Sequence, residues 1–145
     1  MKIEFRNVSK SDWKECISLS VLEEQKGFIA SNAVSLAQSK FDTEMVPVCI
    51  YNNDQMVGFA MYAQDPETDH IWIIRFMIDK NYQNKGLGKA ALKKLIGLLQ
   101  NTFECTEIYL SYEPDNTIAD KLYGTIGFVK TGEVEDGELV SKLCI

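Results

Sequence analysis

Hydrophobic residues alternate with polar residues in several short segments, and this alternation is typical of half-buried β-strands. The most apolar of the segments is Ile71–Ile78, which we expect to be the central strand of the sheet. Polar turn residues separate the segments, as in Asn52–Asp54 and Glu135–Gly137. The predicted strands are residues 2–8, 46–51, 55–63, 71–78, 107–111, 128–132 and 139–143.

Apolar residues three or four positions apart indicate four helices between the strands. Ser9 or Ser11 can cap the first helix, which extends to about Ser20, and Ser31 begins a second short helix. Two longer helices are predicted over residues 86–100 and 116–126, whereas residues 22–30 fit no single pattern. The order of elements is β-α-α-β-β-β-α-β-α-β-β. We therefore predict one α/β domain over residues 1–145 with a mixed sheet.

The composition of the chain excludes several classes of function. Of the 145 residues, 46% are hydrophobic and 25% are charged, as expected for a globular domain. The formal net charge is −6 and no basic cluster is visible, so we expect no nucleic-acid partner. An acidic protein attracts cations, which is compatible with a small cationic amine as substrate.

Cysteine and histidine positions give no pattern for a metal site. The four cysteines are scattered along the chain and only one histidine, His70, is present, so no zinc site of common spacing can form. The N-terminus lacks the features of a signal peptide, and the apolar runs are too short to span a bilayer. We therefore expect a cytoplasmic protein with reduced cysteines and no membrane partner.

The most informative segment follows the predicted central strand and begins the third helix. Gly86 and Gly88 lie at the first turn of this helix, where backbone N–H groups lack partners within the chain. Because glycine has no side chain, a bulky anion can approach these N–H groups closely. Lys85 and Lys89 add positive charge. The segment fits neither the dinucleotide-binding nor the Walker pattern, and glycines that merely permit close packing are the alternative.

Two motifs are similar to those of the GNAT superfamily of N-acetyltransferases. The segment 83–88, Gln-Asn-Lys-Gly-Leu-Gly, resembles the family signature Gln/Arg-x-x-Gly-x-Gly/Ala. The segment 116–128 resembles the family motif Asn-x-x-Ala-x-x-Leu-Tyr-x-x-x-Gly-Phe. Many relatives have Gly where this chain has Asn84, but Asn also tolerates a left-handed backbone.

The resemblance covers nearly the whole chain and implies both a fold and a cofactor. The implied fold is a mixed, mostly antiparallel sheet of about seven strands with about four helices. A V-shaped splay, often at a bulge, is expected between the central strands, and acetyl-coenzyme A is the implied co-substrate. The residues implied to bind it are Phe76, Met77, Ile78, Gln83, Asn84, Lys85, Gly86, Leu87, Gly88, Lys89, Asn116 and Tyr123.

The implied reaction is the direct attack of an amine on the acetyl thioester, which requires a proton acceptor and a proton donor. The family motif assigns the donor to Tyr123, although its spacing also fits a tyrosine packed in the core. Asn116 is implied to bind the pantetheine arm and can also cap the helix. Glu113 is our candidate for the base, and Asp79 and Glu24 are alternatives.

The segments 57–62, 71–79 and 108–111, and the early segment Glu24-Gln25-x-x-Phe28-Ile29, also resemble the bacterial spermine and spermidine acetyltransferases within this superfamily. Carboxylates pair with ammonium groups and aromatic faces attract cations, which makes acidic and aromatic residues candidates for binding a polyamine. These candidates are Glu23, Glu24, Tyr62, Asp65, Glu67 and Trp72. Another small amine, an antibiotic or a protein amine is the alternative acceptor, and a non-catalytic coenzyme A-binding module is a third reading. Relatives often form homodimers, and the terminal strands offer an edge for such pairing.

Overall fold

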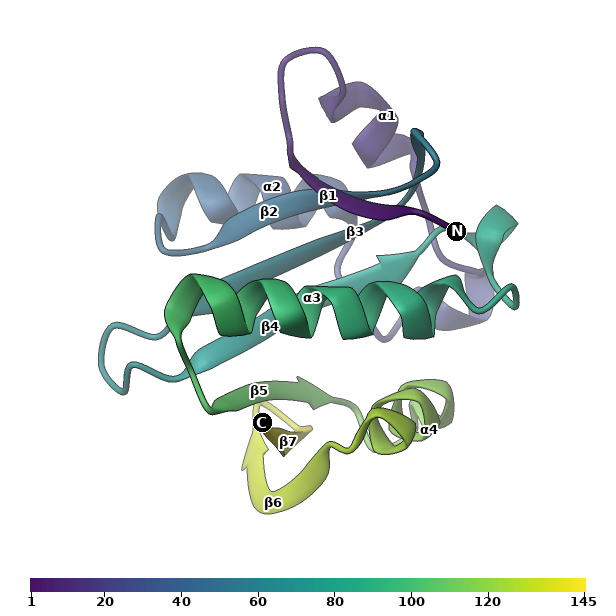
Figure 1. Cartoon of the computed structure of the whole chain (residues 1–145). Coiled ribbons are helices and arrows are strands. Elements are labelled where there is room, and N and C mark those ends of the chain that lie inside the picture. Colours follow the sequence, from purple (N-terminus) through teal and green to yellow (C-terminus); the bar gives the residue numbers. More distant parts are fainter.

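The computed structural model describes residues 1–145 and contains one seven-stranded sheet in the order β1-β2-β3-β4-β5-β7-β6 (Figure 1). The strands are β1 (Ile3–Asn7), β2 (Val46–Asn52), β3 (Gln55–Gln64), β4 (Ile71–Ile78), β5 (Glu107–Tyr112), β6 (Val129–Glu135) and β7 (Glu138–Cys144). Neighbouring strands are antiparallel except for β4 and β5, which are parallel. The predicted mixed, mostly antiparallel α/β sheet is confirmed.

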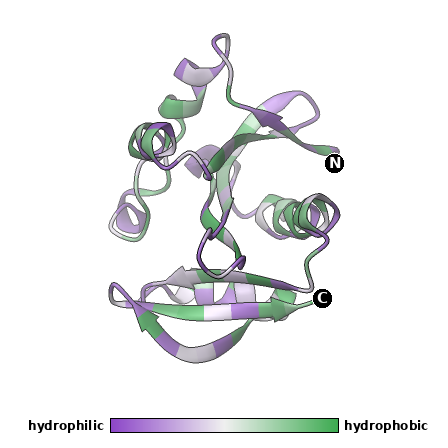
Figure 2. Cartoon of the chain, turned by 90° about the vertical axis from the view of Figure 1, so that its left-hand side faces the viewer, coloured by the Kyte–Doolittle hydropathy of each residue, from purple (hydrophilic) through white to green (hydrophobic).

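Helices cover both faces of this sheet, as Figure 2 shows in a view turned by 90°. They are α1 (Trp13–Ser18), α2 (Asn32–Phe41), α3 (Leu87–Phe103) and α4 (Thr117–Ile126), with the short 3₁₀ helices η1 (Glu23–Gln25) and η2 (Lys80–Tyr82). The larger hydrophobic core lies between α3 and the sheet, and α4 packs against its edge. A smaller core lies on the opposite face beneath α1 and α2. None of the helices is long and apolar enough to cross a lipid bilayer.

The helix ends can be compared with the predicted ones through their capping residues. Ser31 caps α2 as predicted, because its Oγ accepts a hydrogen bond from the Val34 N–H at 3.1 Å. The cap predicted for the first helix was wrong: Asp12 precedes α1, and its carboxylate accepts from the Ser9 N–H instead. The third helix continues to Phe103 and ends at Glu104, which adopts a left-handed conformation with φ of 51°.

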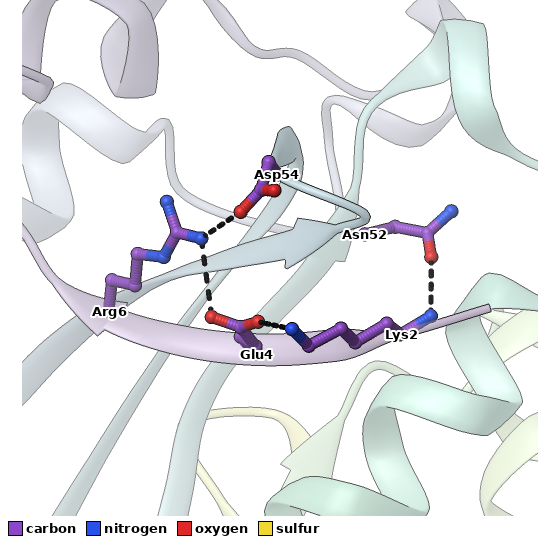
Figure 3. Close-up of polar contacts among 5 residues, drawn as sticks. All are labelled: Lys2, Glu4, Arg6, Asn52 and Asp54. Carbon is purple, nitrogen blue, oxygen red and sulfur yellow. Dashed lines mark hydrogen bonds and ion pairs between the residues drawn. The ribbon is translucent and has the colours of Figure 1, made fainter.

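A polar network fastens the edge strand β1 to the turn between β2 and β3 (Figure 3). Arg6 contacts Asp54 at 2.7 Å and Glu4 at 3.2 Å, and Lys2 contacts Glu4 at 3.2 Å. The Lys2 backbone N–H also donates to Asn52 Oδ1 at 3.1 Å. Exposed ion pairs of this kind add little stability individually, so the network mainly fixes the position of the first strand.

Candidate active site

The central feature of the site is the separation of β4 from β5. These parallel strands pair only at Ile71↔Ile108 and Trp72↔Tyr109, after which β4 stays with β3 and β5 stays with β7. The register of β3 against β4 shifts at this point, leaving Ile74 as an extra residue in β4. A β-bulge of this kind bends its strand. The V-shaped splay that the family resemblance implied is therefore present.

A cleft of about 370 Å³, here called the main cleft, lies within this splay. Its walls are formed by β4, β5, α4, the N-terminal turn of α3 and the segment around η1. Most of its lining is hydrophobic, which suits an extended and mostly apolar ligand arm. The predicted cofactor-binding residues that line it are Phe76, Met77, Ile78, Gln83, Asn84, Gly88, Asn116 and Tyr123.

The N-terminus of α3 has the properties of an anion-binding turn. No side chain caps it, and the first intrahelical bond is that from the Ala90 N–H to the Gly86 carbonyl, so three N–H groups precede it. Gly86 and Asn84 adopt left-handed conformations with φ of 79° and 62°. A Cβ added to Gly86 would meet no atom within 4 Å, so the turn is open to a ligand. These observations fit the diphosphate of coenzyme A at this turn.

The other residues of this turn have different positions. Leu87 is buried and anchors the helix in the core, so only its backbone can reach a ligand. The Lys85 and Lys89 side chains are exposed, and the Lys85 Nζ lies 5.9 Å from the centre of the Tyr82 ring. Lys85, Gly86, Leu87 and Lys89 do not line the main cleft itself but flank its end.

Tyr123 lies on α4 and faces the main cleft. Its ring is held between Tyr112, at a centroid distance of 5.5 Å, and Phe128, at 5.8 Å. Burial raises the pKa of Tyr123 well above its usual range, and the charge of Glu138 acts in the same direction. The phenol is therefore protonated at neutral pH. The sequence left open whether Tyr123 packs in the core or lies in a cleft. In the structure its ring packs against the core and also lines the main cleft.

Asn116 and Glu113, two other predicted site residues, differ in their position relative to the clefts. Asn116 lines the main cleft and also caps α4, because its Oδ1 accepts from the Ala119 N–H at 3.2 Å. Glu113, our candidate base, follows β5 and lines neither of the two clefts described here. The alternative Asp79 is buried and accepts hydrogen bonds from the Ser20 and Asn81 N–H groups, so it holds the backbone.

A second cleft, here called the acidic cleft, has a volume of about 450 Å³. Its carboxylates come from five separate positions: Glu44, Asp65, Glu67, Glu135 and Glu138. Arg75 is the only cationic residue in its lining, and Trp72 is its aromatic residue. The two clefts share Ile73, Ile74, Arg75, Ser111 and Glu138, and therefore meet at the point where β4 and β5 separate.

Arg75 is held firmly at this junction. Its Nη1 donates to the Ile74 carbonyl and its Nη2 donates to Gln38 Oε1, both at 3.0 Å. Burial lowers the pKa of the guanidinium, while the charge of Glu138 opposes this shift. Arg75 therefore places one fixed positive charge in an otherwise acidic surrounding.

The predicted substrate-binding residues occupy three different places in the structure. Asp65, Glu67 and Trp72 come together in the acidic cleft. Glu23 and Glu24 are exposed on η1 and line neither cleft, and Glu23 pairs with Lys26 at 2.8 Å. Tyr62 is buried against Phe103 in the larger core, so its side chain cannot reach a ligand in either cleft.

Several residues of the site were not among the predicted ones. Glu44, Glu135 and Glu138 line the acidic cleft, and Ser111 and Tyr112 line the main cleft. No local motif marks these positions. Glu138 reaches the site because β7 inserts between β5 and β6, which places the start of β7 beside the end of β5. Only the strand order reveals this neighbourhood.

Known proteins resemble this chain in sequence and in structure. The model of the acetyltransferase (GNAT) family matches residues 8–128. A probable spermine N(1)-acetyltransferase of Bacillus subtilis subsp. natto (strain BEST195) is 39% identical over 97% of both chains. The spermine/spermidine N(1)-acetyltransferase of Bacillus subtilis (strain 168) is 38% identical over 97% of both chains.

A solved structure shows the same fold at low identity. The PaiA N-acetyltransferase of Thermoplasma acidophilum, crystallised in complex with coenzyme A, superposes with a TM-score of 0.74 at 14% identity over 100% of both chains. The family match, the two bacterial relatives and this fold agree with one another. The chain therefore belongs to the acetyltransferase (GNAT) family.

Proposed function

We propose that this protein transfers the acetyl group of acetyl-coenzyme A to a primary amine of a polyamine such as spermidine or spermine. The observation that carries the proposal is the junction of two clefts of opposite character. The main cleft ends at an open anion-binding turn, and the acidic cleft joins it where β4 and β5 separate. An anionic donor and a cationic acceptor can therefore meet from opposite directions.

On the donor side, the backbone N–H groups of Leu87, Gly88 and Lys89 would hold the diphosphate, and Lys85 and Lys89 would add charge. Asn116 and the unpaired edge of β4 would position the pantetheine arm along the main cleft. When bound, acetyl-coenzyme A supplies the activated acetyl thioester. The Tyr123 phenol faces this cleft and would donate a proton to the departing sulfur.

On the acceptor side, five carboxylates and one aromatic ring line the acidic cleft. A polyamine carries several ammonium groups separated by short methylene chains, so spaced carboxylates match its charge pattern. Trp72 offers a face for one of these cations. The two Bacillus relatives, which are 38–39% identical and named as spermine or spermidine acetyltransferases, support the same class of acceptor.

The proposal is tested by supplying acetyl-coenzyme A and a panel of amines at equal concentration. The panel contains spermidine, spermine, putrescine, an aminoglycoside, and peptides with free N-terminal or lysine amines. We expect spermidine and spermine to have the highest kcat/KM, because their flexible methylene chains can spread several cations among the separate carboxylates of the acidic cleft. Turnover of an aminoglycoside or peptide without turnover of polyamines would reject the acceptor, and binding of coenzyme A without any turnover would indicate a non-catalytic module.

A further inference from the structure

Glu138 has a position that no other carboxylate of the chain shares. It is the only acidic residue in the lining of the main cleft, and it also lines the acidic cleft. It begins β7 and lies beside the open end of β5, where β4 and β5 have separated. A carboxylate at this junction faces both the donor cleft and the acceptor cleft.

The Glu138 side chain is fixed by a neighbour on another strand. The Ser111 hydroxyl of β5 donates to Glu138 Oε1 at 2.7 Å. This bond is short and involves a charged acceptor, so it orients the carboxylate firmly. The other oxygen, Oε2, takes part in no hydrogen bond or ion pair of the chain, which leaves it able to meet a ligand at the junction.

Charged and titratable groups approach Glu138 from four directions. Arg75 of β4 and Tyr123 of α4 lie close to Glu138: its charge opposes the lowering of the Arg75 pKa by burial, and it adds to the rise of the Tyr123 pKa that burial causes. Glu135 of β6 is its cross-strand partner. The remaining groups, which face it across the acidic cleft, are Glu44, Asp65 and Glu67. Glu138 therefore lies between a fixed cation and the proposed proton donor on one side and the acidic cleft on the other.

The other carboxylates considered as a base are placed less favourably. Glu113 lines neither cleft, and Glu24 is exposed on η1. Asp79 is only 4% exposed and both of its oxygens accept backbone N–H bonds, at 2.8 and 3.1 Å. None of the three lines the junction between the acidic cleft and the main cleft.

On these grounds we infer that Glu138 is the catalytic base that accepts the proton of the substrate ammonium group, an inference that rests on the proposed acetyltransferase function. The ammonium proton passes to Oε2, and the freed nitrogen lone pair forms the C–N bond to the acetyl carbon. The C–S bond breaks, and the sulfur takes the phenol proton of Tyr123. The second nitrogen proton restores that phenol, and Glu138 releases its proton to solvent, so the step balances.

The test is the charge-removing variant Glu138→Gln, which keeps the size of the side chain and can still accept from Ser111. At neutral pH we expect kcat with spermidine to fall by about 100-fold or more. The kcat/KM of the wild type should fall at low pH, where an acidic group becomes protonated. The kcat/KM of the variant should lack this dependence. It should instead rise about tenfold per pH unit toward the pKa of the substrate amine, where no base is needed.

Two further variants distinguish a loss of proton transfer from a general effect of removing a charge and from a loss of folding. Glu133→Gln removes an exposed carboxylate of the same hairpin that lines neither cleft, and should leave kcat and the pH profile unchanged. Glu138→Asp keeps a carboxylate on a shorter chain, and should retain the acidic limb of the pH profile at a lower rate. Calorimetry with coenzyme A shows whether each variant is folded.

A Glu138→Gln variant that binds coenzyme A and keeps the wild-type kcat and pH profile would overturn the inference. So would a Glu138→Asp variant that is folded but lacks the acidic limb. If the wild type acetylates an amine other than spermidine, the same comparison is made with that amine. If the wild type acetylates no amine, the proposed function itself fails, which distinguishes that failure from one confined to Glu138.

Discussion

Gln25 and Gln83 exchange two hydrogen bonds through their side-chain amides, at 3.0 and 3.3 Å, although 58 positions separate them in the sequence. Gln83 also donates to the Ile78 carbonyl at 2.9 Å, and Gln25 accepts from the Leu22 N–H at 3.0 Å. The pair therefore ties η1 and the end of β4 to the loop that precedes α3. Gln83 carries no charge, so we expect it to support the proposed anion site by fixing the geometry of this loop.

Replacing Gln25 by Ala removes this tie without touching the glycines of the turn. Loss of one or two such hydrogen bonds costs about 1 kcal/mol, so we expect KM for acetyl-coenzyme A to rise about 2- to 10-fold with a smaller effect on kcat. Steady-state kinetics with the donor varied provide the measurement. Gln100→Ala, on the exposed surface of α3, is the matched control. An unchanged KM in Gln25→Ala would show that the loop holds its shape without the pair.

Replacing Tyr123 by Phe removes the phenol and keeps the ring between Tyr112 and Phe128. If the phenol donates a proton to the sulfur, we expect kcat to fall by about 100-fold or more while the Kd for coenzyme A stays within about 3-fold. Single-turnover kinetics and calorimetry measure the two quantities separately. A Phe variant with wild-type kcat would assign Tyr123 to packing alone.

Gly58 makes a close backbone approach that a side chain would disturb. A Cβ at this position would collide with the Met77 carbonyl oxygen of β4, a strand that lines the main cleft. We expect Gly58→Ala to lower the free energy of unfolding by about 2–4 kcal/mol, because backbone must move to make room. Urea denaturation followed by circular dichroism measures the change.

Gly97 provides the matched control for this substitution. It lies within α3, and a Cβ there would meet no atom within 4 Å. We expect Gly97→Ala to raise the free energy of unfolding by up to about 1 kcal/mol, because alanine favours the helix. Equal effects of the two substitutions would contradict the close approach at Gly58.

Glu67→Gln tests whether the acidic cleft attracts the substrate through charge. Glu67 is exposed in the loop after β3 and lines this cleft. An exposed ion pair contributes about 0.2–1 kcal/mol, so we expect KM for spermidine to rise about 2- to 5-fold. The difference from wild type should shrink at high salt, because salt screens exposed charges. An effect that is independent of salt would contradict a role of charge.

The parts of the fold and site that could be predicted from sequence are those encoded locally. The hairpin turns at Asn53–Asp54 and Asp136–Gly137 have the positive φ values that such turns require. Asn84 adopts the left-handed conformation expected of it. Gly86 lies at the start of α3 as its motif indicates, and Ile71–Ile78 is a central strand.

The parts that could not be predicted depend on how distant segments pack. Tyr62 and Trp72 are both aromatic residues on neighbouring strands, yet one is in the core and the other lines the acidic cleft. The alternation of a strand does not say which of its faces meets a ligand. Glu138 reaches the junction only through the insertion of β7 between β5 and β6, a long-range arrangement without a local signal.

A crystal structure of the protein with coenzyme A and spermidine is the most direct test of the central claim. We expect the diphosphate on the N–H groups of Leu87–Lys89, the sulfur beside the Tyr123 phenol, and spermidine in the acidic cleft with one amine at Glu138. A coenzyme sulfur remote from Tyr123, or a diphosphate bound away from the N-terminus of α3, would contradict the account.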